Sequence, residues 1–382
     1  MLAIKNVELV LHDHYLPEAV LFVEDGKIVS FGEMRNTVIP EGCEVFDGEG
    51  QYLLPGLVDI HTHTYGTYWF HTEPFKAAAI GLDHGITTVM PAVYFSADRD
   101  TLVEQIKTIR AAKNAPGGEN IGGLYMEAPY MNPKFGCDRE SNPWCGPIKA
   151  EDYMPLLEAA GEDARAWVTA PEREGIEEFV KAAKKANPSV VFTVGHSEAS
   201  PAQIEKLIPY GLCIGTHHTN ATGTIEKYPE CRGVCVDEAV NYSSAIYAEL
   251  ISDCRGIHVD PYMQRLVRKI KGDDRIILIT DATAAGAEGR PVVDLYEGVT
   301  DINFDQENEI SGTRMTLSDA CRNFMKHTGA SLVDVFKMAS YNPANVVGLR
   351  DRGEIAVGKR ADLIVTDGHM NVRTVILQGK VL

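Results

Sequence analysis

Basic residues are scarce in this sequence. It contains 36 Lys and Arg residues against 54 Asp and Glu, which gives a formal net charge of −18 at pH 7. Nucleic acids and anionic membranes are bound chiefly through Lys and Arg, and no basic arm or tail offsets the acidic excess. We therefore expect neither a nucleic acid nor a membrane as a partner, and a small molecule as the ligand.

The sequence also lacks a long apolar run. A membrane-spanning helix needs about 20 consecutive apolar residues, and no segment approaches that length. The residues after Met1, LAIKNVELVL, have neither the basic start nor the small-residue cleavage site of an export signal. We therefore expect a cytoplasmic protein in a reducing compartment.

Paired cysteine motifs are nearly absent as well. The eight cysteines are scattered through 382 residues, and in a reducing compartment such residues stay mostly as free thiols. Cys231 and Cys235 form one CRGVC pair, but no second cysteine pair completes a zinc site. We expect ordinary thiols rather than a cysteine-bound metal.

The two ends of the chain share one pattern. Residues 1–54 and 354–382 consist of short β-like runs separated by turns. Two Asp-Gly dipeptides, at 25–26 and 47–48, are of the kind favoured in tight hairpins. Since neither end is long enough for a generous core of its own, the pattern predicts that both ends pair into one small β domain.

Residues 55–353 carry a different pattern, in which short apolar strands alternate with helical stretches. This alternation is typical of repeated β-α units and a parallel sheet. No G-x-G-x-x-G follows the first strand, which disfavours a doubly wound open sheet. The pattern predicts a (β/α)8 barrel, with strands near 52–61, 85–93, 121–129, 164–171, 189–197, 211–218, 244–252 and 275–283.

Ionisable side chains stand at the ends of these expected strands, where a barrel of this kind carries its chemistry. His61 and His63 are two residues apart in a strand, so both rings point to one face. Each residue alone has an ordinary explanation as a cap or a hydrogen-bonded group, but burying the whole set without compensation is costly. The set consists of His61, His63, Glu127, His196, His217, His218 and Asp281.

A divalent cation, or a pair of them, compensates that cost. Imidazole combined with carboxylate suits zinc, iron, manganese or cobalt. We expect one or two such ions per chain, with zinc as the first choice. A metal with an open coordination position activates water near neutral pH. A nearby carboxylate that is not a ligand can then move protons, the role we expect for Asp281.

The ordered motifs resemble the amidohydrolase superfamily and, within it, the N-acetylglucosamine-6-phosphate deacetylases. The resemblance covers nearly the whole chain and implies a barrel joined to a small β-sandwich made from both chain ends. It also implies a homodimer. The segments that carry it, in the order of that family, are PGLVDIHTH, MEAP, GHS, THHTNA, DCRGIHVDP, TDAT, SGTRMTLSDACRNF, SYNPANVVGL and GEIAVGKRADLIV.

The same resemblance implies which residues bind metal. Glu127, His196 and His217 match the main metal ligands of the family. His61 and His63 match a pair that members with two metal ions retain, so their presence favours two ions here.

Catalytic and substrate-binding roles follow from the resemblance in the same way. Asp281 matches the general base and acid. Asn220 and Ala221 match residues that hold the substrate, and His258 matches a histidine that contacts it. His218, beside a ligand, is expected to support the site rather than to bind metal.

The departures from the family concern specificity. Ala128 stands where the family usually has a glycine, and Asp138 stands where a histidine contacts the substrate. An arginine that binds the sugar phosphate, often across a dimer interface, is replaced by Lys227 and Tyr228, with Arg232 further along. We take Asp138, Lys227 and Tyr228 as candidate substrate contacts. A usual glycine-rich stretch is also replaced, by Tyr65, Tyr68, Trp69 and His71.

The sequence therefore predicts a metal-dependent hydrolase of an N-acyl amine, with an N-acetyl amine as the first expectation. Its best substrate is expected to differ from N-acetylglucosamine 6-phosphate. Two alternatives stay open. One is hydrolysis of a cyclic amide, or deamination, at the same metal site. The other is a catalytically silent small-molecule-binding relative, which the intact Asp281 disfavours.

Overall fold

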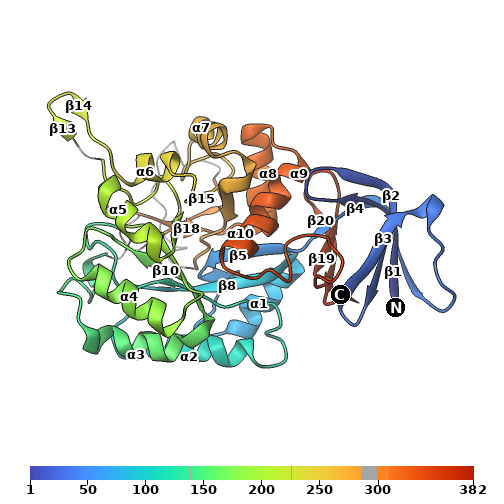
Figure 1. The fold of residues 1–382 in the computed structure, drawn as a ribbon, viewed down its shortest axis with the longest axis horizontal. Helices are drawn as coiled ribbons and strands as arrows, with labels where there is room; N and C mark the ends of the chain where they lie inside the picture. Colours follow the sequence, from blue (N-terminus) through green and yellow to red (C-terminus); the bar gives the residue numbers. More distant parts are fainter. Residues whose placement is uncertain (138, 225, 285–298, 306, 308) are drawn as a thin grey trace.

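The molecule consists of a (β/α)8 barrel and a small β domain (Figure 1). This computed structural model describes residues 1–137, 139–224, 226–284, 299–305, 307 and 309–382. The fold class predicted from the sequence is confirmed, because all eight expected strands form in chain order.

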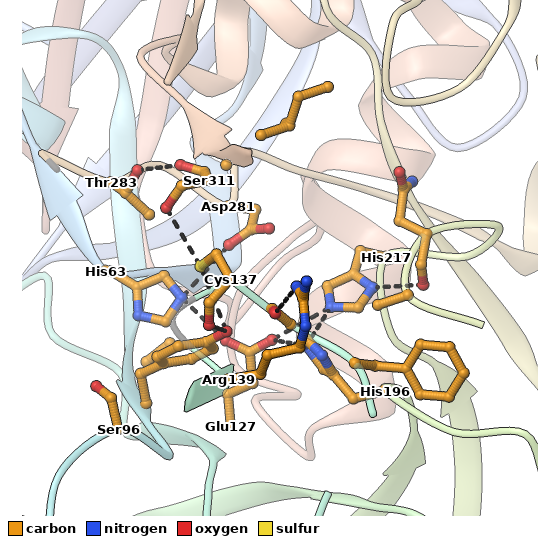
Figure 2. Close-up of a pocket in the computed structure, with 18 of the residues that line it drawn as sticks. His63, Ser96, Glu127, Cys137, Arg139, His196, His217, Asp281, Thr283 and Ser311 are labelled. Carbon is orange, nitrogen blue, oxygen red and sulfur yellow. Dashed lines mark hydrogen bonds and ion pairs between the residues drawn. The ribbon is translucent and has the colours of Figure 1, made fainter. Parts of the chain in front are cut away.

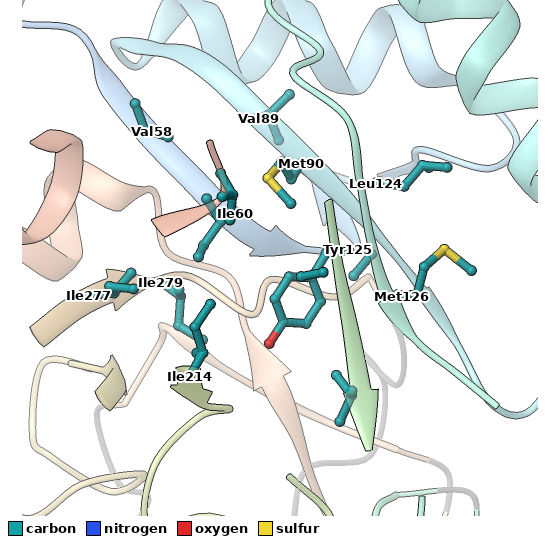
Figure 3. Packing of buried hydrophobic residues seen from close by; sticks show 14 of the residues in the cluster. Val58, Ile60, Val89, Met90, Leu124, Tyr125, Met126, Ile214, Ile277 and Ile279 are labelled. Carbon is teal, nitrogen blue, oxygen red and sulfur yellow. The ribbon is translucent and has the colours of Figure 1, made fainter. Parts of the chain in front are cut away.

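The barrel strands lie side by side in the order in which they occur along the chain, and all are parallel. They are apolar on both faces because helices cover the outside and side chains fill the inside. Tyr125 points to one side of its strand and Leu124 and Met126 to the other (Figure 3). The strands are β5 (Leu57–Thr62), β8 (Ile86–Tyr94), β9 (Leu124–Glu127), β10 (Ala164–Thr169), β11 (Val191–Val194), β12 (Leu212–Gly215), β15 (Tyr247–Ile251) and β16 (Ile276–Ile279).

Hydrogen bonds tie the last strand of the barrel to the first at their C-terminal ends. The backbone N–H of Asp281 donates to the carbonyl of His61 at 2.9 Å. The hydroxyl of Thr280 donates to the buried carboxylate of Asp59 at 2.6 Å. The C-terminal ends of β5 and β16 are thereby held next to each other.

Helices surround the barrel (Figure 1). In α4 the buried positions are Ile176, Phe179, Val180 and Ala183, the spacing of one apolar stripe on a helix. The helices are α1 (Pro74–Asp83), α2 (Arg99–Lys113), α3 (Ala150–Ala160), α4 (Ile176–Ala186), α5 (Pro201–Leu207), α6 (Val236–Tyr242), α7 (Pro261–Lys271), α8 (Leu317–Thr328), α9 (Leu332–Phe336) and α10 (Asn342–Val346). Within the described ranges, no helix combines the length and apolar character that a membrane crossing requires.

Strands from both ends of the chain form one seven-stranded sheet, in the order β21-β20-β19-β4-β1-β2-β3. Strand β19 from the C-terminal segment pairs with β4 from the N-terminal segment, which joins the two ends. The domain boundaries at 54/55 and 353/354 stay a prediction. The strands are β1 (Leu2–Val10), β2 (Tyr15–Glu24), β3 (Lys27–Glu33), β4 (Glu44–Pro55), β19 (Leu363–Thr366), β20 (Val372–Leu377) and β21 (Lys380–Val381).

Among the described residues, three short hairpins branch from the barrel loops. The β13–β14 hairpin projects away from the barrel (Figure 1). The hairpins pair β6 (Thr64–Tyr65) with β7 (Tyr68–Trp69), β13 (Glu226–Tyr228) with β14 (Cys231–Arg232), and β17 (Ile302–Phe304) with β18 (Ile310–Thr313).

Candidate metal centre and active site

The C-terminal ends of the barrel strands bring six of the predicted ionisable residues together. All of them except His61 are labelled in Figure 2. They meet because parallel strands in a barrel all end at the same rim. Each follows or ends a strand, on β5, β9, β11, β12 and β16. The six are His61, His63, Glu127, His196, His217 and Asp281.

One group of three donor atoms fits a single divalent cation. The Nε2 atoms of His196 and His217 lie 2.8 Å and 3.2 Å from Oε1 of Glu127, and 2.9 Å from each other. In a tetrahedral zinc site with bonds of about 2.1 Å, ligand atoms lie about 3.4 Å apart. The separations and the donor types therefore suit one ion.

A second group shares Glu127 with the first. Oε2 of Glu127 lies 3.3 Å from Nε2 of His61 and 3.0 Å from Nε2 of His63. Oδ1 of Asp281 lies 3.4 Å from Nε2 of His63. Both Nε2 of His61 and Oε2 of Glu127 are buried without a hydrogen-bond partner, as expected of atoms that bind a metal. Glu127 thus offers one carboxylate oxygen to each of two candidate metal positions.

The backbone is strained at three of these residues. His196, His217 and Asp281 have φ values of 46°, 28° and 44°, in the left-handed region that residues other than glycine seldom adopt. Such strain is concentrated at functional sites, where the surrounding structure holds the residue in place.

The carboxylates of the site are ionised. Burial would raise the pKa of Glu127, but the charge and hydrogen bonds of three surrounding imidazoles hold it well below its usual value. Burial also opposes ionisation of Asp281, yet its hydrogen bond with His63 and the charge of His61 lower its pKa to about 2. Burial disfavours protonated His63, but Asp281 and Glu127 raise its pKa to about 9. The site therefore requires positive charge, which protons or metal ions on the imidazoles supply.

A pocket of about 510 Å³ opens onto this group of residues. Three of the predicted substrate-binding residues, Asn220, Ala221 and His258, line it. Lys227 and Tyr228 lie instead on the projecting β13–β14 hairpin, with 65% of Tyr228 exposed. The remaining predicted contact, Asp138, lies outside the described residues.

The aromatic residues that replace the glycine-rich stretch separate into two environments. Trp69 and His71 line the pocket, together with Tyr94 and Phe135. Tyr65 is buried and donates to the carboxylate of Asp59 at 2.6 Å, so it stabilises the end of the first strand.

His218 turns away from the candidate ligands. Its Nε2 lies 3.1 Å from the side-chain oxygen of Asn241, and its Nδ1 lies 3.8 Å from Asp237, both on α6. The ring of His217 therefore points into the site, whereas the ring of the next residue, His218, points toward helix α6.

Ion pairs at the pocket were not foreseen from the sequence. Arg139 donates two hydrogen bonds to Glu309, at 2.5 Å and 2.8 Å, and Lys134 donates to Glu198 at 2.7 Å. Arg139, Glu309 and Lys134 line the pocket. The two partners of the Arg139 pair are 170 residues apart in the chain, so no local signal could reveal it.

Glu249 was missed as well. It is fully buried on β15, and its carboxylate contacts the ring of His61 and the backbone of His217. The available signal was an acidic residue in the middle of the apolar strand YAELI.

Comparison with known proteins agrees with this arrangement. N-acetylglucosamine-6-phosphate deacetylase of Lysinibacillus sphaericus is 25% identical over 394 residues, which span 100% of this chain and 97% of that protein. N-acetylgalactosamine-6-phosphate deacetylase of Escherichia coli O157:H7 is 25% identical, with 97% of each chain covered. The crystal structure of N-acetylglucosamine-6-phosphate deacetylase from Pasteurella multocida superposes with a TM-score of 0.85 and 26% identity, over 100% of this chain and 99% of that one. Residues 52–382, most of the chain, match the Amidohydrolase family. The chain therefore belongs to the amidohydrolase family, as its motifs predicted.

Proposed function

We propose that this protein is a metal-dependent hydrolase that cleaves the C–N bond of an N-acyl amine, with N-acetyl amines as the first choice. The observation that carries the proposal is the shared carboxylate of Glu127, which faces two groups of imidazoles at the floor of the pocket. A structural neighbour from Mycobacterium smegmatis, 25% identical, is described as a complex of a deacetylase variant with N-acetyl-D-glucosamine-6-phosphate. That complex supports a small-molecule substrate for this fold.

Two sets of residues would hold the metal. Glu127, His196 and His217 would bind one ion, and His61 and His63, with the second oxygen of Glu127, would bind another. We propose one or two ions per chain, with zinc first and iron, manganese or cobalt as alternatives. A bound divalent cation supplies Lewis acidity, which polarises an amide carbonyl and lowers the pKa of water.

Asp281 is proposed as the group that moves the proton. Its carboxylate is held ionised and lies at the pocket, with 14% of the side chain exposed. It would accept a proton from the water that attacks the carbonyl carbon. When the C–N bond breaks, Asp281 would return that proton to the amine nitrogen. Asn220, Ala221 and His258, which line the same pocket, would hold the substrate.

The part of the substrate that lies away from the cleaved amide bond is proposed to carry no phosphate. The Lys and Arg side chains among the described pocket residues are Lys134 and Arg139, and each is already bound to a carboxylate. Lys227 and Arg232, the other candidate phosphate ligands, lie on the projecting β13–β14 hairpin, where Arg232 donates to Glu238 at 2.6 Å. Phosphate is bound through charge-assisted hydrogen bonds from Arg or Lys side chains that are free to form them, and Arg can form them in pairs.

A substrate panel tests this proposal. We expect unphosphorylated N-acetyl amino sugars or other N-acyl amines to give higher kcat/KM than N-acetylglucosamine 6-phosphate. The measurement is release of free amine, or of acetate, across matched phosphorylated and unphosphorylated compounds. A value of ~10^4 M⁻¹s⁻¹ or more for the phosphosugar, above every other compound, would contradict the specificity but not the reaction.

The Glu309→Gln variant tests why phosphate is disfavoured. Removing this carboxylate releases Arg139 for an anionic substrate, so we expect the ratio of kcat/KM values, phosphorylated over unphosphorylated, to rise about tenfold, or ~1.4 kcal/mol. Glu140→Gln is the matched control, because it removes an exposed carboxylate from the residue next to Arg139. The double variant Glu309→Gln/Arg139→Ala should lose the gain. An unchanged ratio in Glu309→Gln would show that the ion pair does not select the substrate.

We also propose a homodimer and a cytoplasmic location. The projecting β13–β14 hairpin, with its exposed Tyr228, supports contact with a second copy of the chain. The scattered cysteines, which follow no disulfide framework, support a reducing compartment.

A further inference from the structure

A third carboxylate, that of Glu249, lies within hydrogen-bond distance of two candidate metal ligands, His61 and His217. Oε2 of Glu249 lies 3.3 Å from Nδ1 of His61. It also accepts the backbone N–H of His217 at 3.2 Å and the hydroxyl of Tyr125 at 3.1 Å. Glu249 is fully buried, and its other oxygen, Oε1, has no hydrogen-bond partner.

The charge of Glu249 has one compensating partner in the part of the chain that the structure describes, the imidazole of His61. A buried carboxylate that faces neutral groups alone is strongly disfavoured. Positive charge on His61, supplied by a proton or by a cation on the far side of its ring, removes that penalty. Packing alone therefore does not explain an acidic residue at this position.

The hydrogen bond with Glu249 decides which nitrogen of His61 is free. A carboxylate can only accept, so Nδ1 of His61 carries a hydrogen and Nε2 is the nitrogen left for a cation to bind. That Nε2 atom has no hydrogen-bond partner and lies 3.3 Å from Oε2 of Glu127 and 3.7 Å from Oδ1 of Asp281. The ring of Tyr125 stacks on His61 with centroids 4.2 Å apart and planes at 22°, which fixes the ring plane.

We propose that Glu249 is the positioning residue of the candidate metal centre, holding His61 in the tautomer that presents Nε2 to a cation. Its hydrogen bond from the backbone of His217 links this half of the centre to the other half. The inference rests on the proposed metal-dependent function. Carboxylates in this position behind a ligating histidine raise metal affinity by orienting the ring and increasing its basicity.

The Glu249→Gln variant tests the inference. The substitution keeps the size of the side chain but introduces an amide N–H₂, which can donate to Nδ1 of His61. That contact favours the opposite tautomer, with hydrogen on Nε2, which cannot bind a metal. Zinc titration of metal-free protein against a competing chelator should show one site weakened by about 10- to 100-fold, with the other changed less.

Asp59→Asn is the matched control. Asp59 is also a fully buried carboxylate, and it lies on the same strand as His61. It contacts the backbone N–H of His61 rather than its ring. We expect this variant to lower the melting temperature of the metal-free protein while zinc affinity falls by much less than the 10- to 100-fold loss expected for Glu249→Gln.

A measurement on the unmodified protein avoids any folding defect of the variants. In ¹⁵N-histidine spectra of the zinc-loaded protein, His61 should carry hydrogen on Nδ1 and none on Nε2, the nitrogen that the metal would occupy. Equal zinc affinity in Glu249→Gln, or a wild-type His61 with hydrogen on Nε2, would overturn the inference. A wild-type protein that binds no metal after reconstitution would instead overturn the proposed function.

Discussion

Replacing Asp281 with Asn is expected to lower kcat by about 10²- to 10⁴-fold, the range in which a positioned proton-transfer group contributes. Asn has nearly the same shape as Asp but cannot accept the proton of the attacking water. In the unaltered protein, burial opposes ionisation, but the hydrogen bond with His63 and the charge of His61 hold the pKa of Asp281 at about 2. The carboxylate is therefore ionised and ready to accept a proton at neutral pH.

Metal content and substrate binding in Asp281→Asn should stay close to those of wild type. Elemental analysis and equilibrium binding of an N-acyl amine, measured beside kcat, separate loss of chemistry from loss of the centre. Asp98→Asn is the control, because Asp98 caps α2, accepts from the backbone of Thr101 and is not among the residues that line the pocket. If Asp281→Asn loses one metal equivalent, Asp281 acts as a ligand rather than as the proton carrier.

Removal of the metal is expected to have an effect of the same order. Chelation should reduce activity by ~10³-fold or more, because Lewis acidity supplies several kcal/mol of transition-state stabilisation and each 1.36 kcal/mol is tenfold in rate. Readdition of zinc, manganese, iron or cobalt should restore it. In His196→Ala readdition should fail, because Nε2 of His196 lies within 3 Å of both other donor atoms of its group.

His218→Ala is the matched control for that experiment. His218 is a buried histidine next to a candidate ligand, but its ring contacts Asn241 on α6 instead of the centre. We expect the variant to lose stability and to keep its metal. Unaltered protein that holds no transition metal after reconstitution, or that keeps full activity after chelation, would refute the metal-dependent reaction.

The alternation of apolar strands and helical stretches was sufficient to predict the barrel. Strands buried on both faces read as short apolar runs, and a parallel arrangement places all their C-terminal ends at one rim. For the same reason the meeting of His61, His63, Glu127, His196, His217 and Asp281 could be predicted before any distance was known. Each of these residues stands directly at the end of a strand, where the direction of the chain is well determined.

Tertiary structure alone decided the features that depend on how separate loops and strands face one another. The pairing of Arg139 with Glu309 joins two loops 170 residues apart, and counting residues cannot predict where such loops meet. In the same way, the family resemblance suggested Lys227 and Tyr228 as substrate contacts, and the structure places both on the β13–β14 hairpin, which projects away from the barrel. The residues that a loop brings to a site depend on its path, which the local sequence does not determine.

Glu249 shows the same limit inside the barrel. The sequence YAELI predicts a buried strand, but an acidic residue in it faces either the covering helices or the barrel interior. That choice depends on the register of β15 between β12 and β16, since a shift of one residue moves every side chain to the other face. The sequence alone determined the strands and the ligand candidates at their ends. The packed barrel decided which buried side chains, such as Glu249, contact those ligand candidates, because the register of a strand is set by contacts with neighbouring strands.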